Sequence, residues 1–174
     1  MNKCLFSSCC GPLLLIAHQE SLVYCNWVTS ECQSKQIHIE KLFQDEKETT
    51  EDQKVLNETT RQLKEYFSGL RLEFDIPLRL IGTDFQKKVW NLLNLTPYGT
   101  TITYKELSRR FGNPKAIRAI AQACGANPIS IIVPCHRIVS SNGKSGGYTG
   151  GVDKKIVLLS LERTTINNNN HQRE

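Results

Sequence analysis

The chain has 174 residues, of which 39% are hydrophobic and 22% are charged, so it can bury a core as one ordinary domain or two small ones. Its longest apolar run, residues 13–17, is too short for a membrane span or a secretory signal. Seven cysteines, an odd number at irregular spacings, argue against a disulfide framework and for reduced thiols. We therefore expect a soluble protein inside the cell, cytoplasmic in a bacterium or archaeon and nuclear in a eukaryote.

The charge is divided unevenly along the chain. Residues 1–81 carry 9 Lys and Arg against 12 Asp and Glu, whereas residues 82–174 carry 13 against 5. A basic half favours contact with a polyanion, because Lys and Arg that neutralise phosphates release condensed counterions. A solvated basic surface explains the same counts, so the charge alone leaves both interpretations open.

The acidic half is typical of a small sheet followed by a helix. Short strands are predicted at residues 13–17, 22–28 and 36–43. Apolar residues then recur with a helical period over residues 55–67, and Gly69 ends that helix. An extended connector over residues 72–81 follows, and we place the domain boundary at its end.

The basic half contains a helix-turn-helix pattern. Two capping-box signatures, Thr83–Gln86 and Thr103–Glu106, each mark the start of a helix. Gly112 stops the second of these helices. Asn113 and Pro114 then supply an N-cap and a first-turn proline, which predicts that another helix begins two or three residues after the preceding helix ends.

The last helix of this pattern has two distinct faces. Its inner face is apolar, whereas its outer face carries Lys115, Arg118, Ala119 and Gln122 at helical spacing. Such a face fits a DNA groove, where the alanine permits close approach and the arginine can reach in. An ordinary amphipathic surface helix has the same pattern, but the basic charge and the short turn favour nucleic acid.

A single cysteine in the basic half stands among reactive residues. The β-branched run over residues 129–139 is interrupted by Pro-Cys-His-Arg, and we predict a buried strand here. Neighbouring positive charge favours the thiolate of Cys135, which is the nucleophilic form. Side chains alternate along a strand, so His136 would reach the thiol only through a bridging water. A packing role for Cys135 is the second interpretation, although Cys124, on an apolar helical stripe, fits that role better.

The motif Pro134-Cys135-His136-Arg137, preceded by Asn127-Pro128, closely resembles the active-site signature of the O6-alkylguanine-DNA alkyltransferases. The resemblance runs from about Phe85 to Glu162. It includes Val89-Trp90, Pro97-Tyr98-Gly99, Thr103-Tyr104, Asn113-Pro114, Arg118-Ala119 and Gly147-Tyr148-Thr149-Gly150-Gly151. The first half of the chain matches only in size and strand pattern, like the family's variable ribonuclease-H-like domain.

The resemblance implies an α+β fold with two domains. Residues 1–81 would form the ribonuclease-H-like domain, a β-meander plus a helix. Residues 82–165 would form a winged helix-turn-helix-like domain that carries the active-site cysteine. The polar run that ends in Asn167–Asn170 predicts a disordered tail over residues 166–174.

The function that the resemblance implies is DNA repair by direct reversal of damage. The protein would bind double-stranded DNA, rotate an O6-alkylated guanine out of the stack and move the alkyl group to Cys135. O4-alkylthymine is expected as a second substrate. The thioether product is stable, so each molecule would act once, as a monomer and without a cofactor.

The resemblance also implies a role for each catalytic residue. His136 would take the thiol proton through water, and Glu162 would hold and charge-balance the imidazole. Asn127 would brace the turn that presents the thiol, and Tyr104 would give its phenol proton to the departing guanine. Glu162 also stands at the end of a helix predicted over residues 152–161, where the helix dipole disfavours a carboxylate. Either a partner such as His136 or a solvated, frayed end explains that placement.

Several residues are expected to contact DNA. Arg118 would fill the gap that the extruded base leaves, and a flexible lid over residues 148–151 would approach the base. The other expected DNA-binding residues are Lys105, Asn113, Lys115, Gln122, Ser141, Tyr148 and Thr149. Thr149 stands where the family usually has serine and keeps the hydroxyl.

Other functions leave parts of the sequence unexplained. No metal is predicted, since Cys4, Cys25, His18 and His38 show no closed ligand spacing. A winged-helix regulator leaves Pro-Cys-His-Arg without a purpose, and a damage-recognition protein without a nucleophile conflicts with the presence of the cysteine. A thiol hydrolase would need an oxyanion site and a directly bonded base, and the sequence shows neither.

Overall fold

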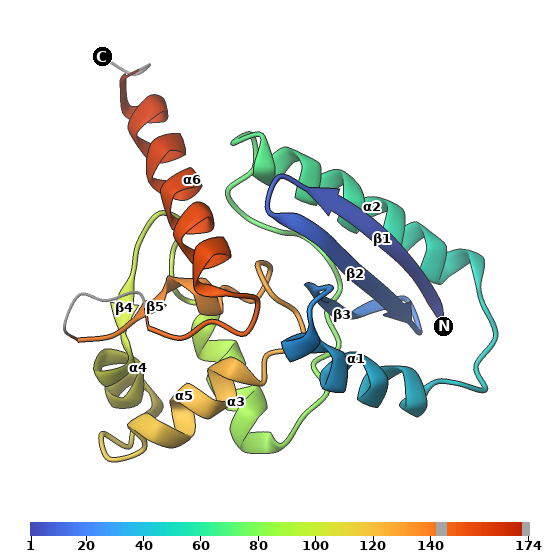
Figure 1. Ribbon diagram of the computed structural model, residues 1–174, viewed down its shortest axis with the longest axis horizontal. Helices are drawn as coiled ribbons and strands as arrows, with labels where there is room; N and C mark the ends of the chain where they lie inside the picture. Colours follow the sequence, from blue (N-terminus) through green and yellow to red (C-terminus); the bar gives the residue numbers. More distant parts are fainter. Residues whose placement is uncertain (142–145, 172–174) are drawn as a thin grey trace. The chain divides into compact units, whose positions relative to one another are not determined.

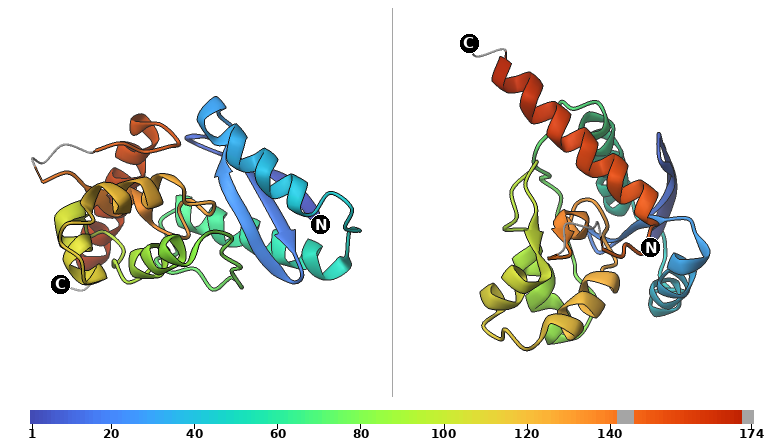
Figure 2. Two further views of the ribbon diagram at one scale, coloured as in Figure 1. Left: turned by 90° about the horizontal axis from the view of Figure 1, so that it is seen from below. Right: turned by 60° about the vertical axis from the view of Figure 1, so that its left-hand side comes forward.

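The computed structural model describes residues 1–141 and 146–171 and divides into two compact units (Figures 1 and 2). The first unit comprises Met1–Ile81 together with Pro128–Ser130, and the second comprises Gly82–Asn127 together with Ile131–Glu174. The predicted α+β fold class is confirmed. In the part of the chain that the structure describes, no helix is long and apolar enough to cross a membrane.

The first unit is built on an antiparallel sheet in the order β1-β2-β3. The strands are β1 (Asn2–Ser8), β2 (Gly11–His18) and β3 (Ser21–Trp27), which confirms the strands predicted near residues 13–17 and 22–28. Nearly every side chain of β2 and β3 is buried, as expected for strands covered on both faces. Helix α2 (Thr50–Phe67) packs against all three strands, and α1 (Ser30–Leu42) packs against β3.

The strand predicted at residues 36–43 is wrong, because this segment lies in α1 and its C-cap. The alternation of Ile37 and Ile39 with polar neighbours covers only a few residues and fits a helix equally well. In the helix, Cys32 and Ile39 are buried seven positions apart, whereas Ile37 is 41% exposed. Ile39 joins a core cluster with Leu14 and Ile16 of the sheet.

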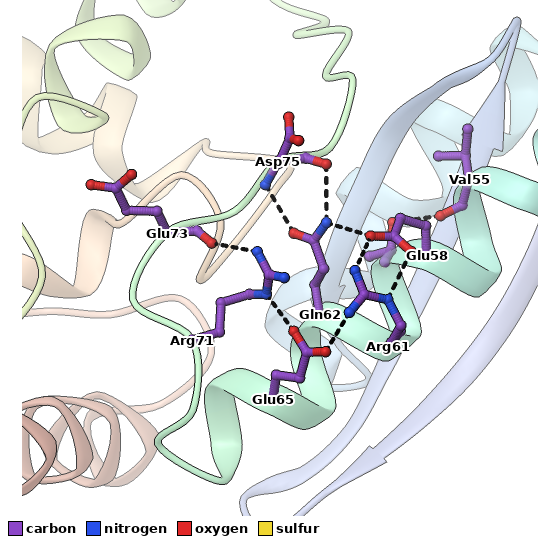
Figure 3. Close-up of polar contacts among 9 residues, drawn as sticks. Val55, Glu58, Arg61, Gln62, Glu65, Arg71, Glu73 and Asp75 are labelled. Atoms are coloured by element: carbon purple, nitrogen blue, oxygen red, sulfur yellow. Dashed lines mark hydrogen bonds and ion pairs between the residues drawn. The ribbon is translucent and has the colours of Figure 1, made fainter.

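Helix α2 follows its prediction and also anchors the connector that leaves it. Its C-terminal half carries a polar network to residues 71–75 (Figure 3). The buried side-chain amide of Gln62 donates to the carbonyl of Asp75 at 3.0 Å and accepts from the Asp75 amide at 2.9 Å. Around it, Arg61 pairs with Glu58 and Glu65, and Glu65 also binds Arg71. The side-chain amide of Gln62 therefore pairs with both backbone groups of Asp75, as the backbone of a neighbouring strand would.

The second unit is mainly helical. Helices α3 (Asp84–Leu93), α4 (Tyr104–Phe111) and α5 (Ile117–Gly125) pack on one another (Figures 1 and 2). Strands β4 (Ile102–Thr103) and β5 (Ile138–Val139) form a short parallel pair. Thr83 and Gln86 form the predicted reciprocal capping box, and Thr103 caps α4 through the amide of Glu106.

The helix predicted from Asn113 begins later, at Ile117, so the turn after α4 spans residues 112–116. The side chain of Asn113 accepts a bond from the amide of Lys115, which forms a local turn in place of a helix cap. Lys115 therefore lies before the helix and not on its face. Arg118, Ala119 and Gln122 are exposed on α5, as predicted.

Two further predictions about the second unit are wrong. The run over residues 129–139 is not a strand, because it forms turns, a 3₁₀ helix η1 (Cys135–Arg137) and only the short β5. Helix α6 (Val152–His171) runs through residues 166–171, where we predicted a disordered tail, and residues 172–174 lie outside the described part of the chain. Glu162 therefore lies in the middle of a helix and not at its end.

The amide of Gln62 makes a testable contribution to stability. Gln62→Met keeps the side-chain length but removes both hydrogen bonds to Asp75, and we expect it to lower the free energy of unfolding by about 1–2 kcal/mol. Arg61→Met, which removes exposed ion pairs from the same helix, is the matched control and should lower the free energy of unfolding much less. Urea denaturation measures both. Equal effects of the two variants would contradict a special role for Gln62.

Candidate active site

The site is built around the Cys135 thiol at the start of η1. Cys135 is 7% exposed and opens into a pocket of about 390 Å³ within the second unit. A pocket of this size suits a small planar ligand such as a nucleobase. The pocket is lined by Tyr104, Ala121, Cys124, Gly125, Cys135, Gly147, Tyr148 and Thr149.

Asn127 holds the thiol from behind. Its buried amide nitrogen donates to the Cys135 sulfur at 3.2 Å and to the carbonyl of Val133 at 2.9 Å. A donor aimed at the sulfur stabilises the thiolate over the thiol. Between these residues, Ile131 has φ = 73°, a conformation that β-branched residues rarely adopt, so the turn is strained. Asn127 therefore bonds both the thiol and the backbone of the turn before it.

Glu162 is the centre of a buried charge cluster. Its carboxylate lies 2.7 Å from His136 Nε2, accepts from Arg137 Nε and Nη2 at about 3.0 Å, and accepts from the amide of Gly99 at 3.0 Å. Burial alone raises the pKa of Glu162, but the hydrogen bonds and charges of His136 and Arg137 outweigh burial and lower it to about 2. Glu162 is therefore ionised at neutral pH.

The imidazole of His136 is neutral in this cluster. It is fully buried, and burial lowers its pKa more than the carboxylate of Glu162 raises it. Because a carboxylate only accepts hydrogen bonds, Nε2 carries the proton and Nδ1 is left as an acceptor. Nδ1 has no hydrogen-bond partner among the described residues. The residue that follows Cys135 in the chain therefore carries an unprotonated ring nitrogen.

Tyr104 and Cys124 share the pocket with Cys135, and both hold their protons. Burial, reinforced by the neighbouring Cys124 and Cys135 thiols, raises the pKa of Tyr104 to about 12. Burial, with a smaller effect of Cys135, raises the pKa of Cys124 to about 12. Tyr104 is therefore a phenol that can donate a proton in the pocket, and Cys124 is a poor competing nucleophile.

Lys155 is a residue of the site that the sequence analysis missed. Its side chain is fully buried, and its ammonium donates to the carbonyls of Ile138 at 2.6 Å and Gly147 at 3.4 Å. Burial lowers its pKa, while Cys135 and Cys124 act in the opposite direction. Lys155 therefore ties β5 to the glycine segment that lines the pocket. The available signal was its place in the buried stripe of α6, which includes Leu158 and Glu162.

The structure divides the predicted DNA-binding residues into two groups. Tyr148 and Thr149 are partly buried and line the pocket, and the Thr149 hydroxyl donates to the carbonyl of Gly125 at 2.8 Å. The remaining side chains are exposed and lie away from the thiol: Lys105, Asn113, Lys115, Arg118, Gln122 and Ser141. The described residues contain no group of three or more His, Cys, Asp or Glu side chains placed to hold a metal ion.

Both halves of the chain match domain models of one known protein family. Residues 84–164 match the model of the 6-O-methylguanine DNA methyltransferase DNA-binding domain, and residues 1–80 match that of the family's ribonuclease-like domain. The chain belongs to the 6-O-methylguanine DNA methyltransferase family. A relative from Methanosarcina acetivorans, named methylated-DNA–protein-cysteine methyltransferase, is 43% identical over 162 residues, which cover 93% of this chain and 98% of the relative.

Solved structures of the family have the same fold. The O6-methylguanine methyltransferase of Mycobacterium tuberculosis superposes with a TM-score of 0.80 at 36% identity, covering 94% of this chain and 93% of that one. The same bacterium's protein in complex with DNA superposes with a TM-score of 0.76 at 36% identity, covering 92% of each chain. The family relationship predicted from Pro134–Arg137 and its neighbouring motifs is therefore confirmed.

The ionised Glu162 should make stability depend on pH. Its pKa is lowered on folding, so its contribution is complete above about pH 5 and is lost as the pH falls toward 2. Glu162→Gln should cost about 3 kcal/mol at pH 7, and the difference from wild type should shrink as the pH falls to 3. Urea denaturation across this range measures it. In the control Glu106→Gln, at an exposed ion pair, the loss should stay below about 1 kcal/mol. A loss at position 162 that is the same at both pH values would contradict this assignment.

Proposed function

We propose that the protein repairs DNA by moving the alkyl group of an O6-alkylguanine in duplex DNA onto Cys135, once per molecule. The observation that carries this proposal is the buried thiol, braced by Asn127 at the wall of a base-sized pocket and backed by the His136–Glu162 pair. The family relationship and the exposed basic face of α4 and α5 support DNA as the partner. We also propose that the protein acts as a monomer.

The chemistry begins with the thiol proton. A water between the two residues passes the proton of Cys135 to Nδ1 of His136, and Glu162 stabilises the imidazolium that forms. The thiolate attacks the sp³ carbon bound to O6, the carbon–oxygen bond breaks, and its electron pair leaves with the guanine. Tyr104 donates its phenol proton to the guanine anion. The products are an S-alkylcysteine and an unmodified guanine, and water cannot hydrolyse the thioether, so the protein is consumed.

The exposed face brings the damaged base to the thiol. Arg118 lies near the start of α5, exposed beside the small Ala119, where it can enter the duplex and replace the extruded base. Extrusion costs a few kcal/mol of unstacking, least for a damaged pair. Lys105 and Lys115 neutralise phosphates on either side, and Tyr148 with Thr149 contacts the base inside the pocket. O4-alkylthymine fits the same chemistry, because its alkyl carbon is also bound to an exocyclic oxygen of a planar base.

The acceptor is tested by mass spectrometry. After incubation with O6-methylguanine duplex, the protein should gain one methyl group on the peptide that contains Cys135, with no turnover beyond one equivalent. Cys135→Ser should gain none, whereas Cys124→Ser should behave as wild type because the pKa of the Cys124 thiol is raised to about 12. Repeated turnover, or a methyl group on Cys124, would overturn the proposal.

Base extrusion is tested at Arg118. Arg118→Ala should slow the repair of duplex DNA at saturating DNA by at least about tenfold, because roughly 1.4 kcal/mol of unstacking cost is no longer offset. Its reaction with free O6-benzylguanine, which has no stack to open, should change by less than about twofold. Lys115→Ala is the matched control, and it should weaken binding and its salt dependence without slowing repair at saturation. Equal losses by Arg118→Ala on both substrates would contradict the role in extrusion.

A further inference from the structure

Strands β1 and β2 form a hairpin (Figure 1), and the turn between them carries two adjacent thiols that the proposed repair chemistry does not use. Cys9 and Cys10 form the two-residue turn between the strands, and their sulfurs lie 3.7 Å apart. Cys9 is exposed and Cys10 is partly exposed. The pair lies in the first unit, whereas Cys135 and its pocket belong to the second.

The turn holds these two side chains in place. Ser8 pairs with Gly11 across the hairpin, and the Ser8 hydroxyl donates to the carbonyl of Gly11 at 2.7 Å. The same hydroxyl accepts from the amide of Cys10 at 3.1 Å. Gly11 has φ = 116°, which residues with a side chain rarely adopt. A turn fixed in this way spares a ligand most of the entropy cost of ordering the two thiols.

The spacing of the sulfurs decides what they can bind. Adjacent Cα atoms are about 3.8 Å apart across a trans peptide, below the range of about 4.4–6.8 Å that disulfides prefer, so an internal disulfide would be strained. Tetrahedral zinc has metal–sulfur bonds of about 2.3 Å, which places two of its thiolate ligands about 3.8 Å apart. The observed 3.7 Å matches that separation without movement of the turn.

We propose that Cys9 and Cys10 form a chelating site for one thiophilic divalent ion of the zinc type. Binding converts two thiols and the free ion into a bis-thiolate complex and releases two protons, with no oxidant or reductant. Among the described residues no group of three or more His, Cys, Asp or Glu side chains could hold a metal ion, so the proposed site consists of the two thiolates, and water is proposed to complete the coordination. Such a site exchanges its ion readily, unlike a closed four-ligand structural site.

The probe for this site is Cd²⁺, titrated into the full-length protein while thiolate-to-metal absorption and proton release are recorded. Wild type should take up one hairpin-bound ion per chain and release two protons with it. Cys9→Ser and Cys10→Ser should each weaken this binding at least tenfold, because each removes half of the chelate. The double variant measures binding by the other thiols. Cys4→Ser, in β1 of the same hairpin, is the matched control and should bind as wild type.

Three results would overturn the proposal. If wild type and the double variant bind Cd²⁺ equally, the ion lies on other thiols. If Cys4→Ser weakens binding as much as Cys9→Ser does, the site is not specific to the Cys9–Cys10 pair. A complex of one ion with four thiolates from two chains would exclude an open site. Methyl transfer to Cys135 should be unchanged in Cys9→Ser and Cys10→Ser, which keeps this test separate from the proposed function.

Discussion

The buried carboxylate of Glu162 is the constraint on which the rest of the site depends. It lies in the middle of α6 with no exposed surface, and it binds two separate parts of the second unit. The amide of Gly99 fixes the segment before β4, while His136 and Arg137 fix η1, which carries the thiol. A buried carboxylate that lost these partners would be strongly destabilising, so folding of the unit and correct placement of the thiol require the same contacts.

The same cluster also sets the protonation state that the chemistry needs. A lone buried carboxylate beside a histidine would draw a proton onto the imidazole and remove the base. Burial is the main force against this, because it lowers the pKa of His136. The guanidinium of Arg137, which pairs with Glu162 and donates to the carbonyl of Thr96 at 2.7 Å, lowers that pKa further. His136 therefore stays neutral with its proton on Nε2. The contacts of Arg137 make it the permanent cation of the cluster, and the proposed mechanism uses His136 as a transient one.

The elements that could be predicted from the sequence were those marked by local patterns of residues. Caps at Thr83 and Thr103 and the periodicity of residues 55–67 located three helices, because those signals lie within one turn of the helix they mark. Residues 36–43 and 129–139 failed because short apolar alternation does not distinguish a strand from a helix or an irregular turn. The family resemblance paired Glu162 with His136, and the two side chains lie 2.7 Å apart, whereas the added argument from a helix end was wrong because α6 continues past Glu162. Lys155 was missed because its partners are backbone carbonyls, which leave no trace in the side-chain pattern.

The segment between α5 and the thiol has its own hydrogen bonds to β3. Pro128–Ser130 belong to that unit, where the Cys25 amide donates to Pro128, the Ser130 amide donates to Cys25, and the Ser130 hydroxyl donates to Asn26. Asn127, immediately before these residues, holds the sulfur of Cys135. The strained Ile131, immediately after them, must keep its positive φ for the chain to return to η1. A strained turn persists only when both of its ends are fixed, and here one end is fixed by hydrogen bonds to β3 and the other by the carboxylate of Glu162. The backbone of Pro128–Ser130, on the path from Asn127 to Ile131, is therefore held by hydrogen bonds to β3 within the first unit.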